Sequence, residues 1–276
     1  MLISALAIGA FQSAMAQDDT PAMIPAPDRS ADEGGGPYSR LIIRGATLID
    51  GTGAPPIGPV DIVIENNRIT EVKSVGYPGL EIDEEKRPSD ATREIDAHGS
   101  YVMPGIIDMH THTGGNTKAP EAEYSYKLWM GHGITTIRGV PSSKVEFSLS
   151  EKARSAKNEI VAPRIFSYHR PGSGEEYEDV DILTPEAARE WVCYIAAEGA
   201  DGLKLGSYRP AIMEALLDEA EKHGLGSTAH LGQMGVAQMN AQDAARLGLG
   251  TLTHYYGLFE AMYENNDVQP WPVDMN

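Results

Sequence analysis

Two histidines separated by a single residue, His110 and His112, end an apolar run in "MPGIIDMHTHTGG", although the 276-residue chain contains only 8 histidines. In an extended strand, side chains at positions i and i+2 point to the same side about 7 Å apart, so both imidazoles can turn onto one cation. Imidazole nitrogen is a common ligand of zinc and similar ions. The pair alone does not separate half of a metal site from two solvated histidines at a strand end.

Three further residues that could take part in a metal site end predicted strands later in the chain. They are Lys204 in "GADGLKLGS", His230 in "GSTAHLG" and His254 in "GTLTHYYG". In a parallel (β/α) barrel the carboxyl ends of all strands meet on one face, and that face holds the active site. Each residue alone fits a solvated lysine or a hydrogen-bonded core histidine. Their shared position at strand ends favours a common metal site.

The remaining residues of this kind have structural explanations. His132 and His223 lie at the C-terminal ends of predicted helices, where a histidine suits the negative end of the helix dipole, and His98 falls in a predicted turn. Cys193 is the only cysteine, which excludes an intrachain disulfide and a zinc site made of cysteines. Because it lies in the helical pattern "EWVCYIAA", we predict a small buried hydrophobic residue rather than a nucleophile.

The elements that must position these residues follow from an alternation of short apolar segments and amphipathic segments after residue 105. Such alternation is typical of parallel strands, in a (β/α) barrel or in an open doubly wound sheet. No Gly-rich phosphate loop follows any of the strands, which disfavours a nucleotide-binding fold. Thr184 and Pro185 suit the start of the helix at 185–198. The predicted strands are 105–110, 134–138, 163–168, 201–205, 226–230 and 250–254, and the predicted helices are 119–131, 144–157, 185–198, 209–223 and 234–247.

The first part of the chain divides into three segments. Residues 1–16 contain the apolar stretch "LISALAIGAF" and the small-x-small pattern "AMA", which predict a signal peptide and therefore an exported (periplasmic or secreted) protein. The apolar run is too short to span a bilayer as a helix. Residues 17–38 are rich in proline, glycine and acids and predict a disordered linker.

Residues 39–104 contain short β-branched segments typical of strands. Asn66 and Asn67 lie between two of these segments and suit a two-residue hairpin turn. "REIDAHGSYVMPG" predicts a further pair of strands turned at Ala97 to Gly99.

The charge of the chain limits its partners. Its formal net charge is −18, with 40 acidic residues against 22 basic ones, which argues against binding nucleic acid or an anionic membrane. We therefore expect a small-molecule substrate, no nucleic-acid partner and no membrane partner after signal cleavage. The oligomeric state is open, a homo-oligomer included.

Six stretches together resemble the amidohydrolase superfamily, in particular its imidazolonepropionase- and prolidase-like members. They are "LIIRGATLIDGTG", "VMPGIIDMHTHTGG", "GHGITTIR", "GADGLKL", "STAHLGQ" and "GTLTHYYG", and they cover residues 40 to about 257 in the order of the family. The resemblance implies an α/β fold with a TIM-like (β/α) barrel over 105–276 and a small flanking β-sandwich portion over 39–104.

The resemblance also implies a set of ligands for two divalent metal ions, with zinc expected. His110 and His112 would bind one ion, and His230 and His254 the second. Lys204 would carry a carbamate, whose two oxygens can bridge metal ions roughly 3.5–4 Å apart. A protonated lysine could not do so, because it has donors and no acceptor.

Two residues after the third predicted barrel strand are candidates for substrate binding. His169 closes that strand in "SYHRPG", and Arg170 follows it. One could polarise the scissile carbonyl group, and the other could hold a substrate carboxylate through a bidentate pair. In some prolidase-like relatives a histidine after the third strand contacts substrate, which favours His169, although a solvated loop explains both residues equally well.

This sequence departs from the family pattern in two places. Gly139 follows "TTIR" where many relatives have an acid, and the chain stops after about six of the eight expected strands. The aspartate that ends the eighth strand in relatives, a metal ligand and proton shuttle, would lie beyond residue 276. Asp267 and Asp274 lie in polar sequence with no strand before them, so neither is proposed in its place.

Two functional hypotheses follow. The first is a hydrolase that uses metal-activated water on amide or peptide-type C–N bonds in small molecules such as dipeptides or N-acyl amino acids. The alternative is a truncated, catalytically inactive fragment that binds metal but lacks the final aspartate. A solute-binding export module has no support beyond the signal peptide.

Overall fold

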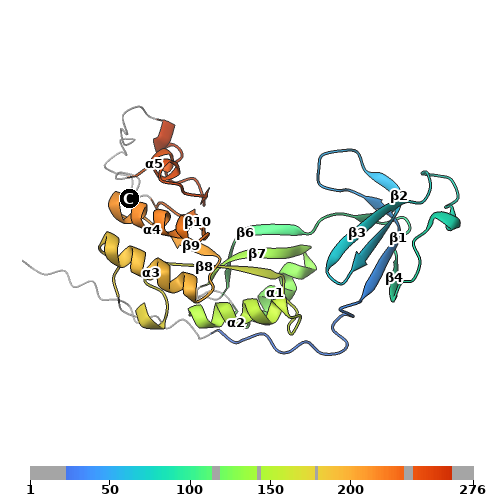
Figure 1. Ribbon diagram of the computed structural model, residues 1–276, viewed down its shortest axis with the longest axis horizontal. Coiled ribbons are helices and arrows are strands. Elements are labelled where there is room, and N and C mark those ends of the chain that lie inside the picture. The colour runs from blue at the N-terminus through green and yellow to red at the C-terminus, as the bar shows by residue number, and fades with distance from the viewer. Residues whose placement is uncertain (1–22, 114–118, 142–143, 178–179, 233–238, 263–276) are drawn as a thin grey trace, which may run out of the picture.

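The computed structural model describes residues 23–113, 119–141, 144–177, 180–232 and 239–262. They form a mixed β-sheet near the N-terminus and a larger α/β part, which Figure 1 shows side by side. The predicted signal peptide at 1–16 lies outside the described residues, as do Asp267 and Asp274. None of the described helices is long and apolar enough to cross a membrane.

The α/β part is built on a curled parallel sheet whose strands neighbour each other in chain order. A doubly wound sheet would instead reverse its strand order at a switch point, so the arrangement agrees with the barrel prediction. The closure of an eight-stranded barrel and the count of six strands out of eight stay predictions. The strands are β6 (Ile106–Thr113), β7 (Ile134–Pro141), β8 (Arg164–His169), β9 (Gly202–Leu205), β10 (Gly226–Ala229) and β11 (Thr251–Leu252).

Five helices connect these strands, close to the predicted positions. The helix at 185–198 begins as expected, because the Thr184 hydroxyl oxygen accepts a hydrogen bond from the Ala187 backbone N–H at 3.2 Å and Pro185 takes the first helical position. The predicted helix at 234–247 begins later, within the described residues, at Ala241. The helices are α1 (Ala122–Gly131), α2 (Val145–Ala156), α3 (Pro185–Ala197), α4 (Pro210–Lys222) and α5 (Ala241–Arg246).

The main hydrophobic core lies between this sheet and helices α3 and α4. Trp191, Leu203 and Leu216 are fully buried in it. The face of α3 that enters the core carries Ala188, Trp191, Val192 and Ile195, and Cys193 falls on the other side of the helix. The prediction of a buried Cys193 is therefore wrong: its side chain is exposed, because the helical periodicity that buries Val192 turns position 193 outward.

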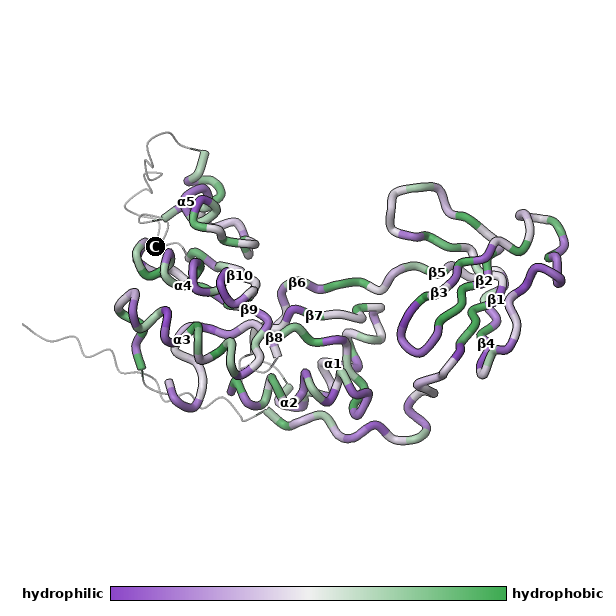
Figure 2. Tube along the Cα trace, viewed as in Figure 1, coloured by the Kyte–Doolittle hydropathy of each residue, from purple (hydrophilic) through white to green (hydrophobic). Residues whose placement is uncertain are grey.

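The N-terminal sheet has β1 (Arg40–Leu48) at its centre. It pairs antiparallel with β2 (Ile57–Glu65), which continues antiparallel into β3 (Arg68–Ser74) through the predicted turn at Asn66, whose φ is 55°. Figure 2 shows the hydrophobic residues concentrated along β1 and β2. The described residues form one sheet here, and the sandwich stays a prediction.

The second predicted hairpin of this region is wrong. β4 (Arg93–Asp96) and β5 (Tyr101–Val102) do not pair with each other, since both align parallel to β1. The turn at 97–100, closed by the hydrogen bond from the Ser100 N–H to the Ala97 carbonyl oxygen at 2.9 Å, lets the chain continue in its original direction. On β1 itself, Gly45 has a φ of 72° and lies where the register with β2 shifts.

A buried carboxylate holds this sheet to the segment before β4. Asp61 is inaccessible to solvent and accepts hydrogen bonds from Arg44 at 2.9 Å, from Arg87 at 3.0 and 3.1 Å and from the Gly45 N–H at 2.8 Å. Burial raises the pKa of Asp61, but these donors outweigh it and the net pKa is lowered. The contribution to stability is therefore complete above the unfolded-state pKa and is lost as the pH falls through the lowered folded-state pKa.

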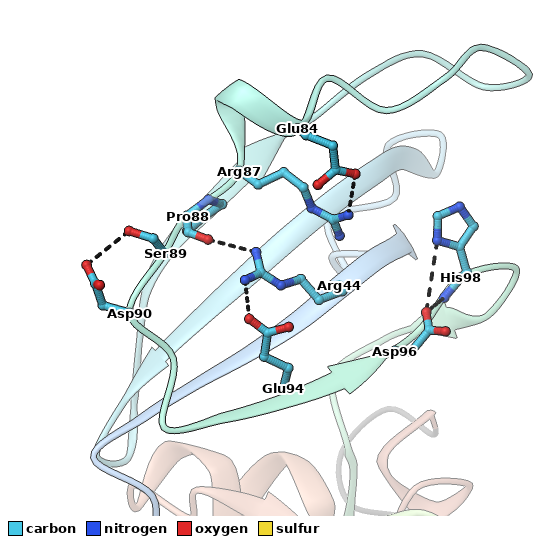
Figure 3. A pocket seen from close by; sticks show the side chains of 9 residues that line it. All are labelled: Arg44, Glu84, Arg87, Pro88, Ser89, Asp90, Glu94, Asp96 and His98. Atoms are coloured by element: carbon cyan, nitrogen blue, oxygen red, sulfur yellow. Dashed lines mark hydrogen bonds and ion pairs between the residues drawn. The ribbon is translucent and has the colours of Figure 1, made fainter.

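The same two arginines line a polar pocket of about 730 Å³ on the N-terminal sheet (Figure 3). Arg44 also binds the Pro88 carbonyl oxygen at 2.8 Å and pairs with Glu94, while Arg87 pairs with Glu84 at 3.1 Å. His98 lies at the rim, in the turn predicted for it. Both arginines of this pocket are already paired with carboxylates, so we assign it a structural role.

Part of the predicted linker is packed against the α/β part. The Ile24 N–H donates to the Pro120 carbonyl oxygen at 2.9 Å, and the Ala26 N–H donates to the buried carboxylate of Glu151 at 3.1 Å. The Ala26 side chain is buried, and the segment follows α1 and α2 in Figure 1. Over residues 23–38, the part of this segment that the structure describes, the chain differs from the prediction of disorder, because backbone polar groups find partners that composition alone does not reveal.

Candidate metal centre

The structure brings together four of the predicted ligands at the carboxyl ends of the parallel strands. β6 runs to Thr113 rather than ending at residue 110, so His110 and His112 both lie in the strand, with their Nε2 atoms 3.0 Å apart. The ring of His254 lies 5.4 Å from that of His110 and 4.9 Å from that of His230, measured between centroids. The four imidazoles therefore form one continuous cluster.

Backbone register places the later members of this cluster. The His230 N–H donates to the Leu205 carbonyl oxygen at 2.9 Å, which fixes the end of β10 beside Lys204 at the end of β9. The Thr253 N–H donates to the Ala229 carbonyl oxygen at 2.8 Å, which fixes the chain before His254. His254 itself has a φ of 65°, a left-handed conformation that non-glycine residues seldom adopt outside turns and functional sites.

Among the residues that the structure describes, the buried side-chain polar atoms that lack a hydrogen-bond partner all belong to this ligand set. Within the described ranges these side-chain atoms are Nδ1 of His110, Nζ of Lys204 and Nε2 of His230. A buried donor or acceptor left unpaired costs about 1–3 kcal/mol, so native proteins satisfy nearly all of them. Coordination of divalent metal ions would satisfy the imidazole nitrogens, and the donor set therefore fits the metal centre that the sequence predicts.

Burial and nearby charges lower the pKa values of three groups in the cluster. Burial, reinforced by the charge of Lys204 and by the neighbouring imidazoles, lowers the pKa of His110 to about 4. Burial and then Lys204 also lower the pKa of His230. Neutral imidazole is the form that binds metal, so both residues are ready to coordinate at neutral pH. Burial, followed by the charges of Arg170 and Arg138, lowers the pKa of Lys204 to about 8.

Arg138 is a buried residue beside the cluster that our sequence reasoning missed. It extends from β7 across the inside of the curled sheet, where its Nε donates to the Met109 carbonyl oxygen at 2.6 Å. Its terminal nitrogens donate to the hydroxyl oxygens of Thr251 at 2.9 Å and Thr228 at 3.3 Å, and its guanidinium lies 5.1 Å from the centre of the Tyr168 ring. The available signal was a charged residue inside the apolar segment "ITTIR", since buried arginines are rare unless they are hydrogen-bonded.

Gly139, the next residue of β7, has room for a side chain. A side chain added there would first meet Thr111 Oγ1 at 3.8 Å, an ordinary contact. Steric exclusion therefore does not explain the glycine.

The two predicted substrate-binding residues are placed differently. His169 is only 2% exposed, and its Nε2 lies 2.8 Å from the hydroxyl oxygen of Ser167. It shares a face of β8 with Ser167 and points away from the side on which Tyr168 meets Arg138. The structure thus does not bring His169 into the cluster, and its contact with substrate stays a prediction.

Arg170, in contrast, is exposed and close to the cluster. Its charge contributes to the lowered pKa values of both Lys204 and His230. Tyr256, whose ring centre lies 5.0 Å from that of His230, adds an aromatic wall that continues into the exposed rings of Tyr255 and Phe259. The sequence stretch "HYYGLF" held this signal, since exposed aromatic residues beside a histidine often mark a binding surface.

Comparisons with known proteins agree with this geometry. The chain is 30% identical over 196 residues to a D-hydantoinase from Streptomyces coelicolor, covering 68% of this chain and 39% of that protein. It is 23% identical over 151 residues to a dihydroorotase from Thermus aquaticus, covering 52% of this chain and 31% of that protein. No family model matches the chain.

Among solved structures, a Xaa-Pro dipeptidase with methionine bound in its active site superposes with a TM-score of 0.57 at 22% identity, covering 78% of this chain and 61% of that chain. This likeness concerns the fold. The chain spans less than half the length of the two curated relatives. Over this part of their length, the comparisons confirm the resemblance to the amidohydrolase superfamily.

We expect Arg138→Met to destabilise the curled sheet and to weaken metal retention. The substitution removes three hydrogen bonds from a charged donor, each worth about 1.5–3 kcal/mol, so the free energy of unfolding should fall by about 4.5 kcal/mol or more in urea titrations. Arg138→Lys keeps the charge but not the fork of donors and should give an intermediate loss. Wild-type midpoints in both variants would contradict this role.

Proposed function

We propose that the chain is part of a metal-dependent hydrolase that cleaves C–N bonds in small molecules. The observation that carries the proposal is the convergence of His110, His112, His230 and His254 beside Lys204, with the unpartnered buried nitrogens of the described chain confined to this set. Relatives named as hydantoinase, dihydroorotase and N-acyl-D-aspartate deacylase support an amidohydrolase-type enzyme.

We assign His110 and His112 to one divalent ion and His230 and His254 to a second. Zinc is the proposed metal because imidazole is one of its preferred ligands, and neutral imidazoles need no proton removed before binding. When bound, such ions lower the pKa of water towards neutrality and polarise a carbonyl oxygen. Arg138 holds β6, β10 and β11 at the spacing that these ligands require.

Lys204 is proposed to carry a carbamate. Its neutral amine would attack the carbon of CO₂, forming an N–C bond and releasing one proton, which leaves a carbamate whose single negative charge is shared by two oxygens. The unpartnered Nζ at the end of β9 supports this assignment, because an unmodified ammonium would stay buried without an acceptor. The lowered pKa of Lys204 keeps part of the amine neutral at physiological pH.

The proposed substrates are dipeptides or N-acyl amino acids. Arg170 would hold the free carboxylate of the substrate, since guanidinium forms bidentate pairs with carboxylates. Tyr255 and Tyr256 would lie against an apolar side chain. The proton-shuttling aspartate expected after an eighth strand is proposed by resemblance alone. Export of the mature protein and its oligomeric state likewise stay proposals.

Metal content tests the proposal directly. The full-length protein should hold about two divalent ions at the strand ends, and a His110→Ala, His112→Ala double variant should lose at least one of them together with dipeptide hydrolysis. Elemental analysis and a hydrolysis assay measure both. The matched control is His98→Ala, His132→Ala, which removes two exposed imidazoles outside the cluster. Equal metal content in the two double variants would place the site elsewhere.

Loss of the carbamate is tested at Lys204. Lys204→Ala should lower kcat at least about 100-fold. This is the upper end of the loss in activity seen when a group that orients metal ligands is removed, and a direct ligand should cost at least as much. Short carboxylic acids such as formate should restore part of the activity, because their oxygens can occupy the position of the carbamate. Lys157→Ala, at the exposed end of α2, should retain activity and show no response to formate. A fully active Lys204→Ala variant would contradict the bridging role.

Recognition of the substrate carboxylate is tested at Arg170. Arg170→Gln should raise KM roughly 10- to 100-fold for N-acyl amino acids, the value of about 1.5–3 kcal/mol expected for hydrogen bonds to a charged group. The corresponding amides should be unaffected, and metal content should not change. Arg246→Gln, on α5 beside Asp243, serves as the control. Equal KM changes for acids and amides would argue against a carboxylate contact.

A further inference from the structure

Three side chains on the outer surface of the helix layer form a second, separate cluster of metal-ligating atoms. Cys193 lies on α3, Glu219 on α4 and His223 at the C-terminal end of α4. Their ligand atoms all lie within 4.8 Å of one another, and all three residues belong to the described part of the chain. The strand-end histidines are not part of it, so the cluster does not depend on the function proposed above.

The spacing of the donor atoms matches the edges of a tetrahedron around one ion. Cys193 Sγ lies 3.5 Å from His223 Nε2 and 3.7 Å from Glu219 Oε1, and the latter two atoms are 3.6 Å apart. A tetrahedral zinc ion, with bonds of about 2.3 Å to sulfur and about 2.0–2.2 Å to nitrogen and oxygen, separates such pairs by roughly 3.4–3.6 Å. Hydrogen bonding does not account for the His223–Glu219 pair, which is too long for it.

Neighbouring charges orient the carboxylate of this cluster. The other oxygen of Glu219, Oε2, accepts from Arg189 at 3.1 Å and from Lys222 at 2.9 Å. Oε1 is thereby left facing the thiol and the imidazole, as outer-shell donors orient ligands in known metal sites. The four-residue spacing of Glu219 and His223 puts both side chains on one face of the helix.

We propose that Cys193, Glu219 and His223 form a metal site for a borderline divalent cation such as Zn²⁺ or Co²⁺. Binding replaces the S–H bond of Cys193 by a sulfur–metal bond and releases the proton to solvent. The fourth position faces water, since Cys193 is exposed. A bound ion would tie α3 to α4 across the outer surface of the helix layer.

A nucleophilic role explains this cysteine less well. Burial, followed by the charge of Glu219, raises the pKa of the Cys193 thiol. A reactive cysteine requires the opposite shift, towards thiolate at neutral pH. A cation can displace the thiol proton where the protein alone does not.

Cobalt substitution tests the site, because a thiolate bound to Co²⁺ gives a charge-transfer band in the near ultraviolet that imidazole and carboxylate do not give. With one cysteine in the chain, the band reports on Cys193 alone. We expect saturation at about one thiolate-bound Co²⁺ per chain, displacement by Zn²⁺, and no band in Cys193→Ser. His223→Gln and Glu219→Gln should each weaken Co²⁺ binding at least about tenfold.

Two controls separate this site from the strand-end centre and from chance binding. His132→Gln removes the corresponding imidazole at the end of α1, which has no cysteine partner, and should leave the titration unchanged. The His110→Ala, His112→Ala variant should keep the band even if it loses its other metal. Absence of a band in the wild type would overturn the proposal. A band of unchanged affinity in His223→Gln, which leaves the ion pairs of Glu219 with Arg189 and Lys222 intact, would also overturn it, because the thiol would then bind cobalt without the imidazole.

Discussion

The shape of the described sheet and the site both depend on the hydrogen bonds that the guanidinium of Arg138 donates. One side chain from β7 reaches the backbone of β6 and the hydroxyls of β10 and β11. β6 carries His110 and His112, His230 directly follows β10, and His254 lies two residues after β11. Because Arg138 forms no ion pair with any described residue, its charge is satisfied by a carbonyl group and hydroxyls that only a curled sheet brings together. The curvature that exposes the strand ends to one another is therefore coupled to one buried cation.

Much of the parallel sheet could be predicted from the sequence because short apolar segments, bounded by glycines, alternate with amphipathic ones. The ends of β6 and β11 could not. β6 extends beyond the apolar run to Thr113, since Thr111 and His112 pair with Gly139 and Val140 of β7, and hydropathy does not record that pairing. The packing of Ile24 and Ala26 against α1 and α2 was hidden for the same reason, because backbone hydrogen bonds leave no trace in composition.

The candidate site shows a similar division. Strand-end position alone predicted the histidine cluster, because parallel strands bring their ends together whatever their loops contain. Predicting the orientation of His169 would have required the alternation of side chains along the strand. Ile165, Ser167 and His169 share one face of β8, and the apolar Ile165 indicates that this face is turned to the helices. The positions of Arg138 and Cys193 could not be predicted without tertiary structure. Arg138 is a buried charge in an apolar strand, and Cys193 is a small apolar-type residue on an exposed helix face.

The electrostatics of the strand-end cluster supply a further argument for chemistry at Lys204. Besides burial, the charges that lower the pKa values of His110, His230 and Lys204 include those of Lys204, Arg138 and Arg170, all of them cationic side chains. Two divalent ions placed among neutral imidazoles would meet this positive field with no anion in the set. Conversion of the Lys204 ammonium to a carbamate changes the local charge from +1 to −1 at the residue whose charge reaches both His110 and His230. A single modification would thus turn a site that repels cations into one that holds them.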